Sequence, residues 1–327
     1  MVTGGTLYDE LARRLGPMAR RQVPLGPLTT YGVGGPAALF VEVATPDDLA
    51  RLRQALAGTR LATLVVGRGS NLLVADAGFD GVALRLGEGF AAVQWPDRTS
   101  TGDGGPAALI AVGAAVPLPV LARQAAEAGW SGLAWAVGVP GSVGGAVRMN
   151  AGGHGSDMAA CLRRYTWVDL ASAAGGTDEV GRLDYGYRSS SVRASDVVLG
   201  AELVVTPGEV AAEKAAVSAI VRWRREHQPG GSNAGSVFTN PEGDSAGRLI
   251  EAAGLKGVRV GSAHVSAKHA NFIQADKGGR ADDVRALMEH VRAAVRERSG
   301  VALSTEVRLL GFSAWETGVV TDAGSER

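Results

Sequence analysis

Hydrophobic residues recur along the chain at two spacings, which predict short strands mixed with amphipathic helices. Runs of apolar residues predict strands at 39–43, 62–66, 82–86, 109–112, 165–170, 197–205, 258–260, 271–274 and 306–310. Apolar positions three and four residues apart predict helices at 7–15, 46–56, 117–129, 209–226, 246–253 and 281–298. Strands and helices do not alternate strictly, which favours an α+β fold over a doubly wound parallel sheet.

The predicted helices carry residues that helix ends and buried faces prefer. Thr45 can cap the helix that Pro46 opens, and Gly129 suits the position just after the helix that begins at Pro117. One face of the helix over 281–298 is apolar, with Val284, Leu287, Met288, Val291 and Val295. That helix is therefore expected to pack against a core.

Two glycine-rich segments interrupt this pattern, one at 139–153 and one at Gly67–Asn71. Glycine inside a helix costs about 1 kcal/mol relative to alanine, so we expect 139–153 to form neither a sound helix nor part of a core. Close approach of backbone amides to a ligand would explain both segments, because a Cβ atom would be in the way. Together they predict a nucleotide cofactor held by main chain, whereas either one alone could be a tight turn.

Neither segment has the spacing of a common nucleotide motif. The chain contains no Gly-x-x-x-x-Gly-Lys-Ser/Thr loop. Gly32–Ala37 has glycines at Rossmann-like spacing, but no strand precedes it and Pro36 stands where the helix should begin. A cofactor fold other than that of the usual dehydrogenases is therefore expected.

Composition narrows the function classes. The chain has 327 residues, 46% of them hydrophobic, and a formal net charge of zero, which gives no electrostatic reason to expect nucleic acid or an anionic membrane as a partner. The single Cys161 excludes an intrachain disulfide and a cysteine-based zinc site, and the five histidines offer no helix-borne pair for a metal. Without a signal peptide or a membrane-length apolar run, the chain is expected to be cytoplasmic.

Three polar residues are candidates for chemistry. Ser236 follows a glycine on a segment expected to be short, buried and extended, and a serine there can donate a proton or merely cap a turn. Arg188 lies between Tyr187 and Ser189 and can offer a bidentate fork to a carboxylate, although a surface arginine over an aromatic ring is commoner. Glu306 begins the last predicted strand, where an acid is usually solvated.

Several motifs, taken in order, resemble one family. They are Thr29–Gly35, Gly67–Asn71, the segment 139–153, Tyr187–Ser190, and Ala234–Pro241 together with Glu306–Arg308. In this order they resemble the UDP-N-acetylenolpyruvoylglucosamine reductases (MurB), flavoenzymes of peptidoglycan precursor synthesis. The resemblance runs from about Leu28 to Gly311 and is to the type II subgroup, because the span from Arg188 to Ser236 is too short for an extra substrate-capping loop.

The resemblance implies a fold, a cofactor and a reaction. The fold would be a two-subdomain FAD-binding half of the vanillyl-alcohol-oxidase (PCMH) type and a C-terminal α+β substrate domain. FAD would be bound non-covalently, and NADPH would be the reductant. The substrate would be UDP-N-acetylglucosamine enolpyruvate, which takes hydride at its β-carbon and a proton at its α-carbon. No obligate protein partner is expected.

The resemblance also assigns residues. Arg188 and Glu306 would polarise the enolpyruvyl carboxylate, and Ser236 would donate the proton. The FAD-binding residues would be Gly67, Arg68, Gly69, Ser70, Asn71, Leu72, Pro140, Gly141, Ser142, Gly144, Gly145, Asn150, Ala151 and Gly152. Tyr187, Arg224, Arg225, Asn240 and His269 would contact the substrate. His227 departs from the family at a position where lysine is expected.

Domain boundaries follow from the same reading. We expect a leader at 1–25, an FAD-binding domain at 26–208 with subdomains near 26–88 and 89–208, a substrate domain with its linker helix at 209–312, and a flexible tail at 313–327. A flavin oxidase of the same cofactor fold, acting on alcohols or aldonolactones, is the alternative enzyme. A non-catalytic flavin or nucleotide-binding protein is the third possibility.

Overall fold

The computed structural model describes residues 4–97 and 106–312, with only the backbone described at 4–6. The chain forms two compact units, each assembled from separated stretches of sequence. The first unit combines 1–21, 39–68 and 82–226, and the second combines 22–38, 69–81 and 227–327. The predicted domains are continuous in sequence and remain a prediction. The expected tail at 313–327 lies outside the described residues.

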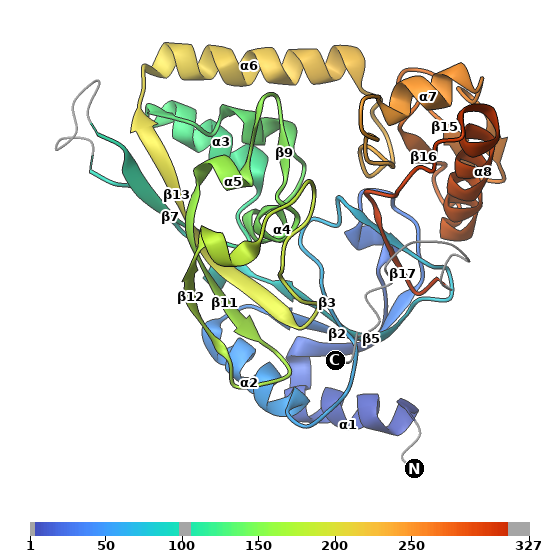
Figure 1. The fold of residues 1–327 in the computed structure, drawn as a ribbon. Helices are drawn as coiled ribbons and strands as arrows, with labels where there is room; N and C mark the ends of the chain where they lie inside the picture. The colour runs from blue at the N-terminus through green and yellow to red at the C-terminus, as the bar shows by residue number, and fades with distance from the viewer. Residues whose placement is uncertain (1–3, 98–105, 313–327) are drawn as a thin grey trace. The chain divides into compact units, whose positions relative to one another are not determined.

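Helices and strands are mixed along the whole chain (Figure 1). The helices are α1 Gly4–Leu15, α2 Pro46–Leu56, α3 Leu118–Glu127, α4 Val143–Met149, α5 Met158–Cys161, α6 Val210–His227, α7 Ala246–Ala252 and α8 Ala281–Ser299. The earlier strands are β1 Ala19–Pro24, β2 Pro36–Val43, β3 Thr63–Val65, β4 Leu72–Val74, β5 Phe79–Leu86, β6 Val93–Gln94, β7 Ala108–Gly113, β8 Trp130–Ser131, β9 Gly152–Gly153 and β10 Ser156–Asp157. The later strands are β11 Leu162–Asp169, β12 Gly175–Glu179, β13 Asp196–Pro207, β14 Arg259–Val260, β15 Ala263–Val265, β16 Ile273–Ala275 and β17 Arg308–Leu310.

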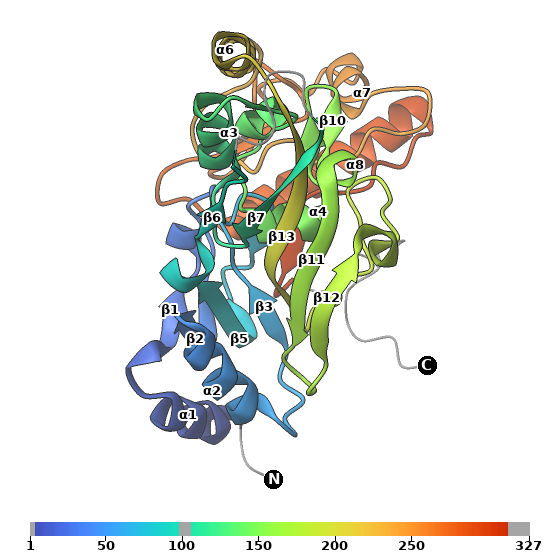
Figure 2. The ribbon, with the colours of Figure 1, turned by 90° about the vertical axis from the view of Figure 1, so that its left-hand side faces the viewer.

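An antiparallel sheet forms the larger part of the first unit. Its strands run in the order β12-β11-β13-β7-β6, and β8 also pairs with β13 (Figure 2). The register sets Tyr165 opposite Ala201 and Leu203 opposite Ile110. Residues of β7, β13, α3 and α4 share one buried cluster, in which Trp130 is among the largest fully buried side chains. This cluster holds α4 and the glycine-rich segment against the sheet.

A second sheet follows the order β1-β2-β5-β3, and its β3–β5 pair is parallel. Residues 82–84 of β5 are fully buried, as a continuous apolar run predicts. The helix α2 beside this sheet begins as expected, because Thr45 and Asp48 form a reciprocal capping box. Gly129 has φ +71° just after α3, which confirms the predicted helix end.

In the second unit, α8 packs on the sheet β14-β15-β16. Its predicted apolar face is buried throughout. The strand β17 pairs in parallel with β4, so that Arg308 lies opposite Leu72 and Leu310 opposite Val74. Most strand pairs of the chain are antiparallel, which agrees with the predicted α+β class.

The expectation that 139–153 forms neither helix nor core is wrong. Residues 143–149 form α4, and Val143, Ala146 and Val147 on its inner face are buried. Ser142 caps the helix, and its hydroxyl accepts from the Gly145 amide at 3.5 Å. Burial of an apolar face therefore outweighs the glycine cost, which tertiary packing commonly does in short helices.

Short and polar strands escaped prediction. The strands β4 and β15 have three residues each, and β12 reads Gly-Gly-Thr-Asp-Glu. Because β12 is an edge strand with exposed side chains, no alternation of apolar residues marks it. Hydrogen bonds to β11 define it instead, with Thr166 opposite Thr177.

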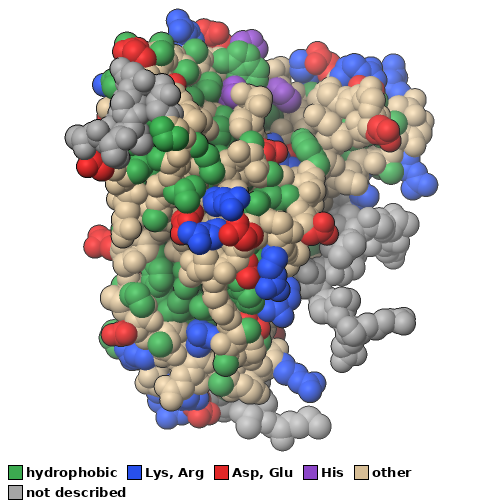
Figure 3. Space-filling view, turned by 60° about the vertical axis from the view of Figure 1, so that its left-hand side comes forward, with side chains coloured by type: hydrophobic (Ala, Val, Ile, Leu, Met, Phe, Trp, Pro, Cys, Tyr) green, Lys and Arg blue, Asp and Glu red, His purple; other side chains and the backbone are tan. Residues whose placement is uncertain are grey.

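Acidic and basic side chains lie next to one another on the face shown in Figure 3, where neither sign forms a broad patch. This distribution agrees with the zero formal net charge. Within residues 4–97 and 106–312, no helix is both long enough and apolar enough to span a membrane.

Two tyrosines allow a test of how much a hydrogen bond to a tyrosine hydroxyl contributes to stability. Tyr31 is fully buried, its hydroxyl has no partner among the described residues, and burial raises its pKa. The Tyr185 hydroxyl instead donates to the Val147 carbonyl at 2.7 Å. Tyr31→Phe should leave the free energy of unfolding unchanged or raise it by up to about 1 kcal/mol, whereas Tyr185→Phe should lower it by about 1 kcal/mol. Urea unfolding of both variants measures this, and a clear loss of stability in Tyr31→Phe would contradict it.

Candidate functional site

Arg188 is fixed on the glycine-rich segment of the first unit. Its Nη1 donates to the Asn150 carbonyl at 3.3 Å and its Nη2 to the Gly152 carbonyl at 2.6 Å. The residue has φ +56°, in the left-handed region, and its guanidinium lies 5.2 Å from the centre of the exposed Tyr187 ring. The structure therefore brings the predicted arginine, which lies beside its tyrosine neighbour, into contact with the segment predicted to bind the cofactor.

Neighbours of Arg188 bind the end of α4 in the same way. The Tyr185 hydroxyl reaches the Val147 carbonyl, and the Ser190 hydroxyl donates to the Arg148 carbonyl at 2.5 Å. The last carbonyls of a helix have no partner within the helix. The segment 185–190 supplies these partners, and this places Arg188. Nothing in the sequence pattern marks Tyr185 or Ser190 for this role.

Asn150 links the same two segments. It ends α4 with φ +41°, a left-handed conformation that asparagine tolerates better than most residues. Its Nδ2 donates to the Gly186 carbonyl at 3.1 Å, and its Oδ1 accepts from the Ala159 amide at 3.0 Å. Both ends of this buried side chain are therefore engaged by protein, as are its backbone amide, which donates to the Ala146 carbonyl, and its carbonyl, which accepts from Arg188.

The Gly67–Asn71 segment presents backbone amides without protein partners. Among the described residues, none of its amides donates a hydrogen bond to protein. A Cβ atom at Gly67 would lie 2.6 Å from the Ser142 Oγ, and one at Gly69, where φ is +62°, would overlap the Leu28 carbonyl. The glycines thus permit close backbone packing, and the amides stay available for the oxygens of a phosphate.

The amides that begin α4 are used differently. Those of Val143 and Gly144 donate to the Val116 and Ala114 carbonyls, each at 2.9 Å, and that of Gly145 is bonded to Ser142. At Gly145, however, the Cα is exposed and a Cβ would meet only the Ser142 Oγ, at 3.6 Å. This segment can therefore offer a bare backbone surface to a flat ligand, whereas Gly67–Asn71 can hold charged oxygens. The two segments together fit a dinucleotide cofactor.

In the second unit, the segments that carry Ser236 and Glu306 are paired. The Glu306 amide donates to the Val237 carbonyl at 2.8 Å, and the Thr239 amide donates to the Ser304 carbonyl at 2.9 Å. Phe238 and Thr305 form the bridge between them. Both Ser236 and Glu306 are partly buried. Ser236 itself lies outside any strand, beside the isolated bridge of Phe238, so the expected buried, extended segment stays a prediction. The structure adds the pairing of this segment with the one that carries Glu306.

Two asparagines hold this pair in place. Asn71 donates from Nδ2 to the Glu306 carbonyl at 3.0 Å and accepts at its own carbonyl from the Arg308 amide, also at 3.0 Å. The buried Asn271 receives the Phe238 amide at 3.0 Å and donates back to the Phe238 carbonyl at 2.8 Å. Asn71 was predicted to bind the cofactor. Asn271 was missed, since a lone buried asparagine leaves no periodic signal.

The remaining predicted substrate residues lie in both units. In the second, the Asn240 Oδ1 accepts from the Ala246 amide at 3.1 Å, and the His269 Nδ1 accepts from the Asn271 amide at 3.2 Å. Burial, and then Lys256, lower the pKa of His269, which keeps the ring neutral at pH 7. In the first unit, burial lowers the pKa of Arg224, whereas Arg225 is exposed on α6.

His154, beside the glycine-rich segment, packs against protein. Its ring meets that of Trp223 on α6 at 5.1 Å, edge to face. Burial, and then the charge of Arg224, lower the pKa of His154. A Cβ atom at Gly138 would lie 2.7 Å from this ring, so the glycine there makes room for the histidine. The neutral ring thus links α6 to the turn that precedes α4.

Comparison with known proteins shows which class of protein this chain belongs to. Residues 37–179 match the FAD binding domain family, so the first unit's fold and both glycine-rich segments are those of a flavoprotein. Residues 227–310 match the C-terminal domain of UDP-N-acetylenolpyruvoylglucosamine reductase. The chain therefore has the α+β architecture expected from its sequence, an FAD-binding half followed by a family-specific C-terminal domain.

Whole-chain similarity is equally clear. The chain is 42% identical over 301 residues to UDP-N-acetylenolpyruvoylglucosamine reductase 2 of Symbiobacterium thermophilum, covering 90% of this chain and 93% of that protein. It is 41% identical over 304 residues to the reductase of an Anaeromyxobacter species, with 92% of each chain covered. The crystal structure of the Thermus caldophilus reductase is similar with a TM-score of 0.75 and 36% identity, over 89% of this chain and 99% of that one. The chain belongs to the UDP-N-acetylenolpyruvoylglucosamine reductase family.

Adjacent glycines in α4 allow a matched test of the flavin surface. A Cβ atom at Gly144 would lie 2.9 Å from the Ala114 Cβ, whereas one at Gly145 would meet only the Ser142 Oγ. In flavin-free protein, Gly145→Ala should raise the free energy of unfolding by up to about 1 kcal/mol through helix propensity. Gly144→Ala should lower it by about 1 kcal/mol, because the overlap outweighs that gain.

The same pair separates folding from cofactor binding. If the exposed Gly145 faces FAD, Gly145→Ala should weaken FAD binding, measured by fluorescence titration, although it stabilises the protein. An unchanged FAD affinity in this variant would remove Gly145 from the flavin surface.

Proposed function

We propose that this protein catalyses the NADPH-dependent reduction of UDP-N-acetylglucosamine enolpyruvate to UDP-N-acetylmuramate, with FAD as its resident cofactor. The observation that carries the proposal is the pairing of the Ser236 segment with the Glu306 segment in a chain of this family. It gives a proton donor and a carboxyl group a common scaffold. The enzyme acts in the cytoplasm on two soluble substrates and needs no obligate protein partner.

FAD, when bound, supplies a two-electron carrier that accepts hydride from NADPH and delivers it to the β-carbon of the enolpyruvyl ether. The amides of Gly67–Asn71 would hold its pyrophosphate, and the bare backbone around Gly145 would lie against its ring system. The bonds from Arg188 to the carbonyls of Asn150 and Gly152 keep the guanidinium beside this surface.

Protein side chains then handle the charge that develops on the substrate. Hydride addition at the β-carbon leaves negative charge at the α-carbon and in the carboxylate. Arg188 stabilises it by presenting its planar fork to the carboxylate. Glu306 contributes in a protonated or hydrogen-bonded form, because two bare carboxylates would repel. Ser236 donates the proton to the α-carbon, and the charge of Arg188 lowers the cost of the transfer.

Residues without a role in the chemical step bind the remainder of the substrate. Tyr187 covers the guanidinium of Arg188 and contacts the substrate from the solvent side. Arg224 and Arg225 would bind the diphosphate, and Asn240 and His269 would contact the substrate. Asn240 retains its amide Nδ2 for this purpose, since its Oδ1 is bonded to Ala246.

Two half-reactions test the function directly. FAD-loaded protein is first bleached anaerobically with NADPH, and UDP-N-acetylglucosamine enolpyruvate is then added. Rapid return of the flavin absorbance without oxygen is expected, with UDP-N-acetylmuramate as the product. Reoxidation only by oxygen would overturn the proposal and favour an oxidase, and a protein that binds no FAD would overturn the cofactor assignment as well.

Ser236→Ala tests the proton donor. Reduction by NADPH should keep its normal rate, whereas reoxidation by the enolpyruvyl substrate should slow by about 10²–10⁴-fold, the range of a lost general acid. Ser304→Ala is the matched control, because Ser304 is exposed and belongs to the paired segment. The control should behave as wild type in both half-reactions. Equal slowing of both half-reactions in Ser236→Ala would contradict the role.

A further inference from the structure

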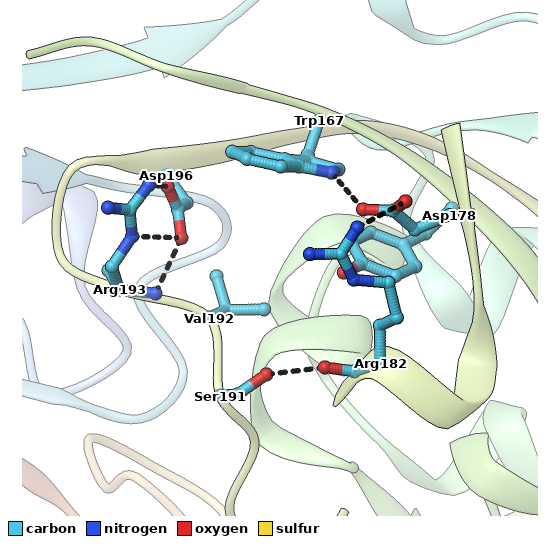
Figure 4. A pocket seen from close by; sticks show the side chains of 8 residues that line it. Trp167, Asp178, Arg182, Ser191, Val192, Arg193 and Asp196 are labelled. Atoms are coloured by element: carbon cyan, nitrogen blue, oxygen red, sulfur yellow. Dashed lines mark hydrogen bonds and ion pairs between the residues drawn. The ribbon is translucent and has the colours of Figure 1, made fainter. Parts of the chain in front are cut away.

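A cavity of about 300 Å³ opens in the first unit, and no residue with a role in the proposed reaction lines it. Its walls come from β11, β12 and β13, from the turn that carries Arg182 and from the loop 191–193 (Figure 4). The volume is at the lower end for sites that take small organic ligands. The residues that line it combine aromatic, aliphatic and charged groups, which together limit what it can bind.

Aromatic and aliphatic side chains form its apolar part. Tyr165 and Trp167 come from alternate positions of β11, so they lie on one face of that strand, and Val192 faces them from the loop. The Trp167 indole is held at its edge, where its N–H donates to Asp178 at 2.7 Å. Burial raises the pKa of Tyr165 and keeps its phenol neutral. These fixed, uncharged surfaces suit a flat ring.

The charged residues are ordered with carboxylates inside and guanidiniums outside. Asp178 pairs with Arg182 at 3.1 Å, and the side chains are 18% and 71% exposed. Asp196 pairs with Arg193 at 2.7 Å, with exposures of 10% and 57%. Both carboxylates are thus already satisfied by protein donors. The groups that remain accessible at the mouth of the cavity are cationic.

Arg193 and Arg182 differ in how many of their N–H donors are bonded to protein. Arg193 donates to Asp196 from Nε and Nη2 and also to Asp169 from Nη2 at 3.2 Å, so it is part of a fixed network. Arg182 donates to Asp178 through Nη1 alone. Its Nε and Nη2 donate to no protein acceptor within the described part of the chain. Arg182 therefore keeps donors for an incoming anion.

We propose that this cavity binds a small planar aromatic anion, with its ring against Trp167 and Val192 and its anionic group on Arg182. A cationic ligand would find both carboxylates engaged, and an uncharged ring would make no use of the Arg182 donors that face solvent. Guanidinium groups bind carboxylates and phosphates in the same manner, so either group satisfies the chemistry.

The cavity is connected to Arg188 by a short path of covalent and hydrogen bonds, through which a bound ligand can affect that residue. The loop 191–193 continues directly from Arg188, and the Arg193 carbonyl accepts from Arg148 at 2.6 Å. The Arg148 carbonyl in turn accepts from Ser190 at 2.5 Å. A ligand that packs against Val192 therefore contacts this path and biases the position of Arg188. This part of the inference rests on the proposed role of Arg188.

Binding is tested first, and without reference to activity. FAD-loaded protein is titrated with 2-naphthoate, with 2-naphthyl phosphate as the phosphate probe and with 2-naphthalenemethanol as the uncharged analogue, by ligand-observed NMR. Saturable binding of at least one anion is expected, with a Kd on the order of 1 mM or below, together with weaker binding of the alcohol. Which anion binds more tightly decides between carboxylate and phosphate.

Variants localise the binding. Arg182→Gln removes the charge of an exposed side chain and should weaken binding of the anion by about tenfold. Arg163→Gln is the matched control, because Arg163 is also an exposed arginine paired with a carboxylate, that of Glu179, and because it lies on β11 but does not line the cavity. It should bind as wild type does. No saturable binding, or equal binding by Arg182→Gln and wild type, would overturn the proposal.

Coupling to the reaction is measured separately. A saturating anion should change the KM for the enolpyruvyl substrate by about fivefold in wild type and leave Arg182→Gln unchanged. Binding without this difference would overturn the coupling to Arg188 and leave the site intact. A failure of the reductase assay itself would count against the proposed function and not against the titration.

Discussion

The carbonyls at the end of α4 are the constraint on which the first unit's site depends. A helix of seven residues with two glycines has little stability of its own, and its last carbonyls have no partner inside it. Burying them unpaired would cost about 1–3 kcal/mol each. The hydroxyls of Tyr185 and Ser190 prevent this, because they donate to the Val147 and Arg148 carbonyls. Arg188 lies between them in sequence, and its guanidinium donates to the Asn150 and Gly152 carbonyls just beyond the helix. The bonds that complete the helix thus also fix the segment that carries Arg188.

In the second unit, asparagine side chains bind the backbone groups that would otherwise lack partners. Asn71 bonds to the backbone on either side of Val307, and Asn271 bonds to the amide and carbonyl of Phe238. Each amide connects segments that are far apart in the chain. The backbone next to Ser236 and Glu306 is fixed by these bonds. Arg188 differs, because its own guanidinium is bonded to the Asn150 and Gly152 carbonyls.

Helices and strands with clear hydrophobic periodicity were predictable from the sequence. The hydrogen bonds that position the candidate site residues were not. The face of α8, the capping box at Thr45 and the buried run in β5 follow from local spacing, because burial and helix ends leave periodic signals. The helix α4 was missed because its glycine content was judged without the sheet that covers it. The roles of Arg188, Ser236 and Glu306 remain predictions that rest on family motifs. Their supports Tyr185, Ser190 and Asn271 are single polar residues whose meaning depends on distant partners.

The parallel pairing of β17 with β4 has a consequence for the order in which the protein can form. The strand β4 lies at 72–74, but its partner at 308–310 is among the last described residues to leave the ribosome. Chains are made from the N-terminus, and pairings across long stretches of sequence are slow to form. The first unit has all its residues once synthesis has passed 226, whereas the second still lacks its largest piece. The Gly67–Asn71 segment, which ends where β4 begins, therefore cannot take its final support until residues 306–310 have been synthesised. A protein truncated before β17 would lose this support for a segment more than two hundred residues upstream of the break.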